Sequence, residues 1–327
     1  MLDSSDFIKS LIDKKYTHLC VVPCSFAKNI INESINNILI EYLPCSSEAV
    51  ACSIAAGLKM SGKKPIIIVQ SSGLTNMGSC ITSLLKTYGI KIPMLVSWRT
   101  YNSGDSEIQH KHLATNLPSL IKAYGYSYEI LSKQNISTAI SQIEKCNTSN
   151  LICILEKETF SKVALQKKHE LSLNSRIKRS EFLKILNNYY KEKKALFIGT
   201  TGNTAREMYT FMPNTNNFYM AGNMGGALSL GLGAAKGGNL GRYSKQINLT
   251  YIIFDNESNK STGGQKTYQD HINYSLLAKS ANIQNTYIAN TNRSFLSALK
   301  KKQPKAFILS TQSVHMMPKP QDLQLRL

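Results

Sequence analysis

The chain has 327 residues, of which 42% are hydrophobic and 18% are charged. This composition is typical of a globular protein and excludes a disordered or fibrous chain, and the length predicts two domains that each bury a core. A formal net charge of +19 would suit a nucleic-acid partner. However, the lysines are scattered among asparagines and isoleucines without an Arg-rich arm or an RNA-binding signature, so we expect no nucleic-acid partner.

Other classes of protein are also disfavoured. No stretch approaches the roughly 18 apolar residues of a membrane span, and acids occupy the first positions where a signal peptide would carry lysines, which predicts a cytoplasmic protein without a membrane partner. The seven cysteines are odd in number and lack Cys-x-x-Cys spacing, so we expect reduced thiols that act as small hydrophobic residues. The six histidines show no His-x-x-x-His pattern, which argues against a zinc site.

Short apolar runs alternate with helical patterns along the first half of the chain. This alternation predicts βαβ units and a parallel sheet that is covered on both faces. The predicted strands are residues 18–22, 38–43, 65–70, 93–98 and 151–155, and the predicted helices are residues 47–60, 76–88 and 118–124. No Gly-x-Gly-x-x-Gly follows the first strand, which disfavours a dinucleotide-binding enzyme.

A polar, basic stretch at residues 156–178 interrupts the apolar pattern and predicts a domain boundary. Beyond it we expect helices at 179–190, 224–235, 272–281 and 293–301, and strands at 195–199, 218–220, 249–254 and 306–310. The predicted fold class is therefore α/β, with two doubly wound parallel-sheet domains at residues 1–170 and 176–327.

A single carboxylate stands out after the second predicted strand. Ser47 offers a helix N-cap, and Glu48 occupies the first turn of a helix of mostly small and apolar residues. A carboxylate at this position is commonly only a favourable partner of the helix dipole. Here the surrounding helix is expected to be buried, and a buried carboxylate needs a dedicated partner.

Together with the Glu48 segment, seven motifs follow one another in a recognisable order. They lie at residues 22–25, 70–76, 92–99, 107–110, 201–207, 222–225 and 261–265. In this order the chain resembles the phosphonopyruvate and sulfopyruvate decarboxylases, a family of thiamine-diphosphate-dependent 2-oxo-acid decarboxylases, over most of its length. The resemblance implies a thiamine-diphosphate-binding fold with a pyrimidine half and a diphosphate half.

The resemblance also implies roles for individual residues. Glu48 would bind the pyrimidine ring and favour formation of the thiazolium ylid, and His110 would act in the substrate pocket. The implied cofactor contacts are Ser72, Gly73, Gly222, Asn223, Met224, Gly225, Ser261, Thr262 and Gly263, and the implied substrate contacts are Ser25, Arg99 and Gln109. Alternatives without a role in catalysis stay open for these residues. The glycines suit ordinary strand-to-helix turns, and an imidazole in a loop, such as that of His110, is commonly only solvated. Arg99 could pair with an acidic side chain, and Met224 could be a core residue.

One part of the family pattern is absent. The family holds Mg²⁺ on the diphosphate through a Gly-Asp-Gly motif and a downstream Asn, because this hard cation prefers oxygen ligands. The resemblance assigns the downstream ligands to Asp255 and Asn256, with Glu257 as a substitute, but the Gly-Asp-Gly motif does not occur. We therefore expect that a core strand of the second domain is missing.

The implied reaction is the non-oxidative decarboxylation of 3-phosphonopyruvate to phosphonoacetaldehyde and carbon dioxide, in phosphonate biosynthesis. The implied cofactors are thiamine diphosphate and Mg²⁺, and the implied substrate is a small anionic 2-oxo acid. The site would lie between two subunits, so a homodimer or larger homo-oligomer is expected. Two alternatives stay open: a sulfopyruvate decarboxylase, and a cofactor-impaired, non-catalytic homologue.

Overall fold

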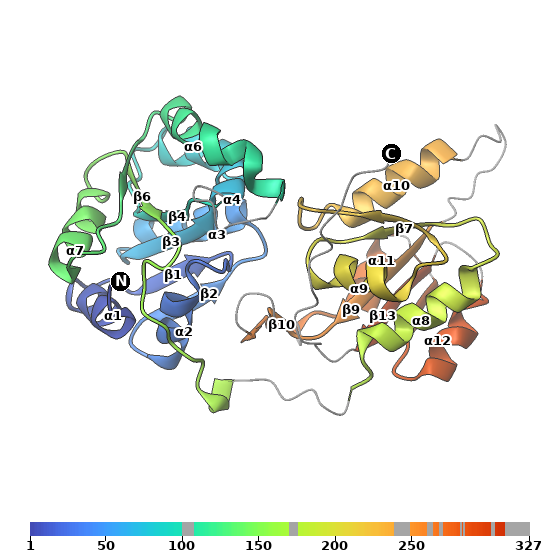
Figure 1. Ribbon diagram of the computed structural model, residues 1–327. Helices are drawn as coiled ribbons and strands as arrows, with labels where there is room; N and C mark the ends of the chain where they lie inside the picture. The colour runs from blue at the N-terminus through green and yellow to red at the C-terminus, as the bar shows by residue number, and fades with distance from the viewer. Residues whose placement is uncertain are drawn as a thin grey trace. The chain divides into compact units, whose positions relative to one another are not determined.

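The computed structural model describes residues 1–99, 108–169, 176–238, 249–259, 264–267, 271–281, 283, 285–301 and 305–310. These residues form two compact units (Figure 1). The N-terminal unit continues from Met1 to the end of η3 (Lys167–His169) and includes Gly264 to Lys266. The C-terminal unit contains the remaining described residues. Within the described residues, no helix has the length and apolar character needed to cross a bilayer.

The N-terminal unit alternates strands and helices. In chain order its elements are α1 (Ser4–Asp13), β1 (His18–Val21), α2 (Lys28–Asn36), β2 (Glu41–Pro44), α3 (Glu48–Met60), β3 (Pro65–Gln70), α4 (Ser71–Asn76), α5 (Gly78–Cys80), η1 (Ile81–Leu85), β4 (Met94–Ser97), η2 (Ile108–His110), α6 (Lys111–Ala123), β5 (Ser127–Ile130), α7 (Ile136–Lys145), β6 (Leu151–Leu155), η3, and the later β11 (Gln265–Lys266). The six strands β1 to β6 form one parallel sheet in the order β2-β1-β3-β4-β6-β5.

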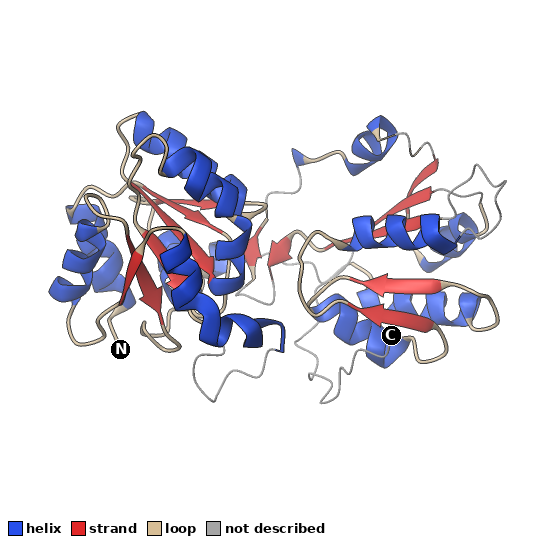
Figure 2. Cartoon of the chain, turned by 90° about the horizontal axis from the view of Figure 1, so that it is seen from above, coloured by secondary structure: helices blue, strands red, loops and turns tan. Residues whose placement is uncertain are grey.

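This sheet is buried on both faces (Figure 2). Successive side chains of a strand point to opposite faces, and in β3 the side chains of Ile66 and Ile68 join one core whereas those of Ile67 and Val69 join the other. The first core includes side chains of α1, α2 and α7, and the second includes side chains of α3, α4 and α6. The predicted doubly wound α/β fold is thus confirmed for this unit.

Three predicted elements of this unit have wrong boundaries, and one of them is the helix predicted at residues 118–124, which begins at Lys111. The second strand begins at Glu41 rather than at residue 38, because Ile38 is 88% exposed and belongs to the preceding turn. The helix predicted at residues 76–88 is broken into α4, α5 and η1, and α4 already begins at Ser71. The edge strand β5 was not predicted, because its sequence Ser-Tyr-Glu-Ile is polar and mostly exposed.

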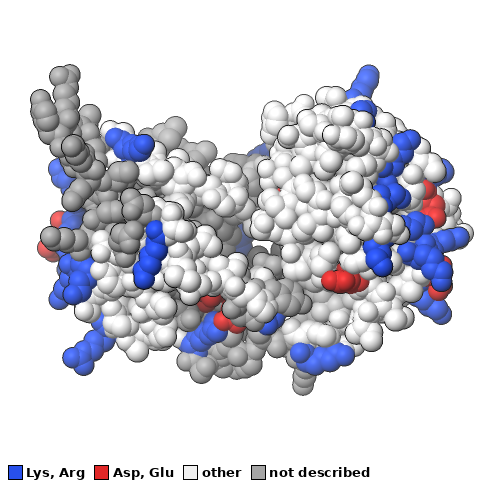
Figure 3. All heavy atoms as spheres, turned by 180° about the vertical axis from the view of Figure 1, so that it is seen from behind, with Lys and Arg blue, Asp and Glu red and all other residues white. Residues whose placement is uncertain are grey.

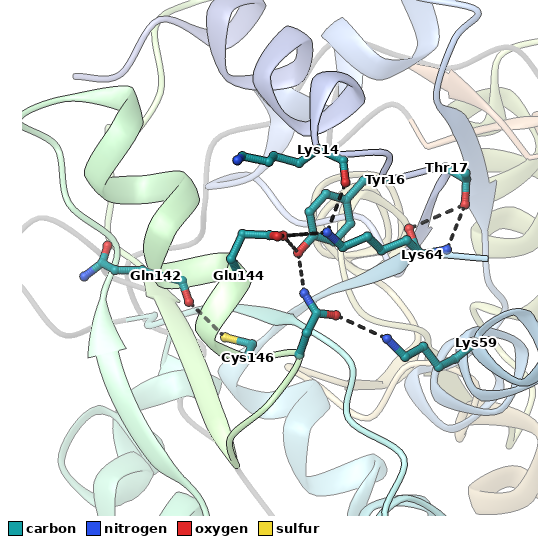
Figure 4. A network of polar contacts seen from close by, with 9 residues as sticks. Lys14, Tyr16, Thr17, Lys59, Lys64, Gln142, Glu144 and Cys146 are labelled. Atoms are coloured by element: carbon teal, nitrogen blue, oxygen red, sulfur yellow. Dashed lines mark hydrogen bonds and ion pairs between the residues drawn. The ribbon is translucent and has the colours of Figure 1, made fainter. Parts of the chain in front are cut away.

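A polar network lies at the amino-terminal edge of the same sheet (Figure 4). The Glu144 carboxylate accepts hydrogen bonds from Lys64 Nζ at 2.7 Å and from the Tyr16 hydroxyl at 2.5 Å. Asn147 Nδ2 in turn donates to the Tyr16 hydroxyl at 2.7 Å. These contacts connect α7 to the residues that precede β1 and β3, and we interpret the network as structural.

The C-terminal unit has a similar alternation. Its elements are α8 (Arg179–Tyr190), β7 (Leu196–Gly199), α9 (Asn203–Phe211), β8 (Asn216–Tyr219), α10 (Ala227–Gly238), β9 (Thr250–Asp255), β10 (Ser258–Asn259), α11 (Tyr274–Ser280), β12 (Asn285–Ile288), α12 (Asn292–Leu299) and β13 (Lys305–Ser310). A buried ion pair joins α8 to α9, with Arg179 Nη2 2.6 Å from Glu207 Oε1 and Arg179 Nε 3.0 Å from Glu207 Oε2.

The strands β7, β8, β9, β12 and β13 of this unit form two separate parallel ladders. β8 pairs with β7, and β12 pairs with β13, which also pairs with β9. If this unit were wound like the N-terminal sheet, one further strand would lie between β7 and β9. No strand occupies that place in the described part of the chain. Residues 239–248, between α10 and β9, lie outside the described residues, so the expectation that a core strand is missing stays a prediction.

Helix α10 contributes a link between the two ladders. A side-chain carbon added at Gly231 would lie 3.4 Å from Leu249, directly before β9, and 3.9 Å from Ile198 of β7. These are ordinary van der Waals distances, so α10 packs against both ladders at this position.

Candidate active site

The predicted site residues of the N-terminal unit follow the carboxyl ends of neighbouring strands. Ser25 comes after β1, Glu48 after β2, Ser72 after β3 and Arg99 after β4. Because the strands are parallel and adjacent, these positions share one edge of the sheet. Open α/β sheets bind their ligands at this edge, where the winding changes direction.

Glu48 is the first residue of α3. Ser47 caps this helix, since its side-chain oxygen accepts a hydrogen bond from the Val50 backbone N–H at 3.3 Å. The cap fixes the start of the helix and so places Glu48 in its first turn. Glu48 is half-buried in the chain alone, whereas the sequence predicted a buried carboxylate.

The Glu48 carboxylate lies against α4. Its Oε2 accepts a hydrogen bond from Asn76 Nδ2 at 2.9 Å. A side-chain carbon at Gly73 would come within 2.7 Å of Glu48 Cδ, so only glycine leaves room for the carboxylate at this position. The structure therefore brings together Glu48 and Gly73, two predicted site residues, and adds Asn76. Asn76 lies in a motif that carried the resemblance, but nothing in the sequence alone paired it with a residue 28 positions away.

A second group of predicted residues lies beside the first turn of α4. The Arg99 backbone N–H donates to Ser71 Oγ at 3.4 Å, and the Arg99 guanidinium carbon lies 4.8 Å from the centre of the Phe26 ring. Arg99 is buried, and Ser25, next to Phe26, is exposed. A buried guanidinium at the carboxyl edge of the sheet is suited to hold an anionic group.

His110 and Gln109 lie on η2, directly before α6. His110 is only 3% exposed, so the alternative of a solvated surface imidazole is wrong. Gln109 is half-buried. The start of α6 is tied to the end of β4, because Trp98 Nε1 donates to the Ala114 carbonyl oxygen at 3.0 Å. The roles of His110 and Gln109 in the substrate pocket stay predictions.

Five of the seven cysteines are buried, and Cys45 and Cys80 are partly exposed. All seven are free. Burial raises the pKa of both Cys20 and Cys52 to about 12, which keeps these thiols protonated at neutral pH. Cys24 Sγ, near the end of β1, lies 2.8 Å from Ser97 Oγ. These residues act as small core side chains, as their sequence context predicts.

In the C-terminal unit, the glycine-rich turn before α10 holds four predicted cofactor contacts. Asn223 and Gly225 have positive φ angles of 57° and 86°, a conformation that favours glycine or asparagine. Met224 is 73% exposed, which rules out the alternative of a core methionine in this chain. Gly222 is half-buried in the same turn. The turn therefore presents backbone and a large apolar side chain to the outside of the unit.

The second predicted contact segment falls partly outside the described residues. Ser261, Thr262 and Gly263 are not described. Gln265, the last residue of the same motif, is fully buried, and its Nε2 donates to Asn32 Oδ1 on α2 at 2.9 Å. Within the motif, Gln265 therefore has a structural contact in the N-terminal unit.

The predicted metal ligands do not form a magnesium site in the described residues. Asp255 Oδ1 accepts the backbone N–H of Glu257 at 3.1 Å, and Asn256 Oδ1 accepts that of Ser258 at 3.4 Å. Glu257, the substitute ligand, is paired with Arg176. No group of three or more His, Cys, Asp or Glu side chains that could hold a metal ion occurs in the described part of the chain. The residues present do not fit an octahedral Mg²⁺, which prefers several oxygen ligands.

Charge on the surface is unevenly distributed. On the N-terminal unit, seen at the right of Figure 3, lysines and arginines gather toward its right-hand side, and much of the rest of its visible face carries few charged side chains.

Comparison with known proteins identifies the N-terminal region. Residues 4–116 match the family described as "Thiamine pyrophosphate enzyme, N-terminal TPP binding domain". Glu48, Gly73, Asn76, Arg99 and His110 all lie within this match.

Relatives extend the similarity to most of the chain. A phosphonopyruvate decarboxylase from Streptomyces viridochromogenes is 24% identical over 315 residues, which include 85% of this chain and 79% of the relative. A sulfopyruvate decarboxylase from Methanosarcina acetivorans is 25% identical over 324 residues, with 86% and 82% covered. Each alignment has more positions than the number of residues of this chain that it includes. The extra positions are gaps in this chain, so both relatives contain residues that have no counterpart here.

Among solved structures, a benzoylformate decarboxylase from Polynucleobacter necessarius is 14% identical, with a TM-score of 0.35 over 61% of this chain and 38% of that chain. This overlap is too limited to support any detail of the site. Residues 4–116 are thus similar to the N-terminal domain of thiamine pyrophosphate enzymes, and most of the chain is similar to enzymes named as phosphonopyruvate and sulfopyruvate decarboxylases.

Proposed function

We propose that the chain catalyses the non-oxidative decarboxylation of 3-phosphonopyruvate to phosphonoacetaldehyde and carbon dioxide, in phosphonate biosynthesis. The observation that carries the proposal is the Glu48 carboxylate, held against Gly73 by Asn76 at the carboxyl edge of a complete six-stranded sheet. A pyruvate-like substrate is supported by relatives named for phosphonopyruvate and sulfopyruvate. The cationic balance of the chain is compatible with an anionic substrate.

The residues of the N-terminal unit fit the pyrimidine side of thiamine diphosphate. When bound, this cofactor supplies the nucleophilic carbon and the electron sink for loss of carbon dioxide. Glu48 would hold and move a proton at the pyrimidine ring through its carboxylate. Ser72 and Gly73 would line the same place, and the turn from Gly222 to Gly225 of another copy of the chain would supply further cofactor contacts.

Arg99, Ser25 and Gln109 are proposed to bind the anionic substrate, and His110 to move a proton near it. Arg99 is the strongest of these candidates, because its cation is buried at the edge of the sheet and rests on an aromatic ring. The experiment that tests the head group is steady-state kinetics with phosphonopyruvate and sulfopyruvate, measured as release of carbon dioxide. A higher kcat/KM for the phosphonate is expected, and a strong preference for the sulfonate would replace the assignment.

We further propose that the site is shared between two copies of the chain in a homo-oligomer. Val50, Ser53, Ile54 and Gly57 form an exposed, uncharged stripe on α3, directly beside Glu48, and Val50 and Ile54 are each 40% exposed. An Ile54→Lys variant should place a charge in this interface and yield monomers in sedimentation experiments. Wild-type sedimentation as a monomer at micromolar concentration would refute this arrangement.

A second candidate function is favoured by the gap between β7 and β9. The described residues there provide neither a further strand nor a magnesium site, so the chain could be a cofactor-impaired, non-catalytic homologue. Titration calorimetry with thiamine diphosphate and Mg²⁺ distinguishes the two. Heat that saturates at micromolar cofactor supports the enzyme, and no heat at millimolar cofactor supports the impaired homologue.

A further inference from the structure

A single hydrogen bond joins Asn76 to the Glu48 carboxylate. Asn76 is an exposed residue at the end of α4, and its Nδ2 donates to Glu48 Oε2 at 2.9 Å. No residue in the described part of the chain forms an ion pair with Glu48. The carboxylate that the proposed function depends on is therefore held by one neutral donor.

Gly73 restricts the same carboxylate from a second side. A carbon atom added at Gly73 would lie 2.4 Å from Glu48 Oε1, 2.6 Å from Cγ and 2.7 Å from Cδ. The carboxylate thus rests on the backbone of α4 at Gly73, while Asn76, almost one turn later, holds its Oε2. Two contacts from one short helix together define the direction of the Glu48 side chain.

A neutral donor suits a carboxylate that must exchange a proton. A lysine or arginine at the position of Asn76 would strongly favour the charged carboxylate and oppose its protonation. An amide fixes the orientation with a hydrogen bond of modest strength. It also leaves Oε1 without a hydrogen-bond donor among the described residues, so this oxygen is available to a ligand.

We propose that Asn76 is a positioning residue, which orients Glu48 so that Oε1 meets the pyrimidine ring of the cofactor. The inference rests on the proposed function, because it assigns Asn76 to the same site. A positioning role can be distinguished from a structural role by measurement. Loss of this exposed hydrogen bond should change the free energy of unfolding only slightly, whereas a misdirected Glu48 should slow proton transfer specifically.

The test compares three variants of the full chain, Asn76→Ala, Asn76→Asp and Asn76→Gln, with the control Asn116→Ala. Asn116 is also an exposed helical asparagine, but its Nδ2 donates only to the His112 carbonyl oxygen of its own helix. Exchange of the C2 proton of bound thiamine diphosphate for deuterium is followed by NMR, and cofactor affinity is measured by calorimetry.

The expected result is slower exchange with nearly unchanged affinity. Asn76→Ala should reduce the exchange rate about tenfold, which corresponds to the loss of one hydrogen bond. Asn76→Asp should reduce it further, about a hundredfold, because two carboxylates would repel each other. Asn76→Gln should recover part of the rate, Asn116→Ala should match the wild type, and all affinities should agree within about twofold.

A second readout needs no cofactor. The side-chain amide signal of Asn76 in the cofactor-free chain should shift in a Glu48→Gln variant, since its acceptor loses its charge. Unchanged exchange in Asn76→Ala and Asn76→Asp, with a wild type that does accelerate exchange, would overturn the role of Asn76 and leave the proposed function standing. A wild type that fails to accelerate exchange would overturn the proposed function itself.

Discussion

Replacement of Gly73 by alanine tests the geometry of the site most severely. The added carbon would lie 2.4 Å from Glu48 Oε1, a distance at which the two atoms cannot coexist. The Glu48 side chain is half-buried, so it can turn away from α4 without moving the backbone. When it turns, it gives up the hydrogen bond from Asn76.

The expected change in stability is small and the expected change in activity is large. Loss of an exposed hydrogen bond lowers the free energy of unfolding by about 0.5–1.5 kcal/mol. Replacement of glycine by alanine within a helix raises it by about 0.5–1 kcal/mol. The free energy of unfolding should therefore change by less than about 1 kcal/mol. General acid–base groups contribute about 10²- to 10⁴-fold to rates, so kcat should fall at least about a hundredfold.

The assay combines urea denaturation with measurement of carbon dioxide release. Gly233→Ala is the matched control, because Gly233 lies within α10 with no atom within 4 Å of an added carbon. The control should be slightly more stable than the wild type and equally active. A Gly73→Ala enzyme with wild-type kcat would show that Glu48 does not act from its position against α4.

Three further predictions follow from single contacts. Arg99→Gln should raise the KM for the anionic 2-oxo acid about tenfold or more, since hydrogen bonds to charged groups are worth about 1.5–3 kcal/mol, and an unchanged KM would remove Arg99 from the substrate site. Burial raises the pKa of Glu144, but the hydrogen bonds from Lys64 and Tyr16 outweigh it and the pKa is lowered. This stabilisation is present above the ordinary carboxyl pKa and is lost as the pH falls through the lowered value. Glu144→Gln should therefore cost about 1 kcal/mol at pH 7, and its curve of unfolding free energy should approach that of the wild type as the pH falls below the lowered pKa. Arg179→Met should cost about 3–5 kcal/mol by urea denaturation, because it leaves the fully buried Glu207 unpaired, and a cost under 1 kcal/mol would contradict a buried pair.

The fold of the N-terminal unit was largely predictable from its apolar runs. Strands such as β3 and β6 are buried on both faces and consist of consecutive apolar residues, so their positions follow from composition. The edge strand β5 could not be predicted, because an exposed edge carries no apolar signal. Residue 38 was assigned to a strand because isoleucine favours strands, although Ile38 lies in an exposed turn.

The candidate site was predictable in its parts and unpredictable in its contacts. Glu48 could be singled out because Ser47 marks the helix start before a run of small residues. Its pairing with Asn76 depends on the adjacent ends of β2, β1 and β3, and periodicity within one segment does not contain this information. The missing strand of the second domain is expected from the absent Gly-Asp-Gly motif and stays a prediction, because residues 239–248 lie outside the described residues.

The most direct test of the central claim is the exchange of the thiamine diphosphate C2 proton in the wild type and in a Glu48→Gln variant. If Glu48 activates the cofactor, the wild type should exchange this proton far faster than free thiamine diphosphate does, and the variant should bind the cofactor without accelerating exchange. Equal exchange rates in the two proteins would contradict the account.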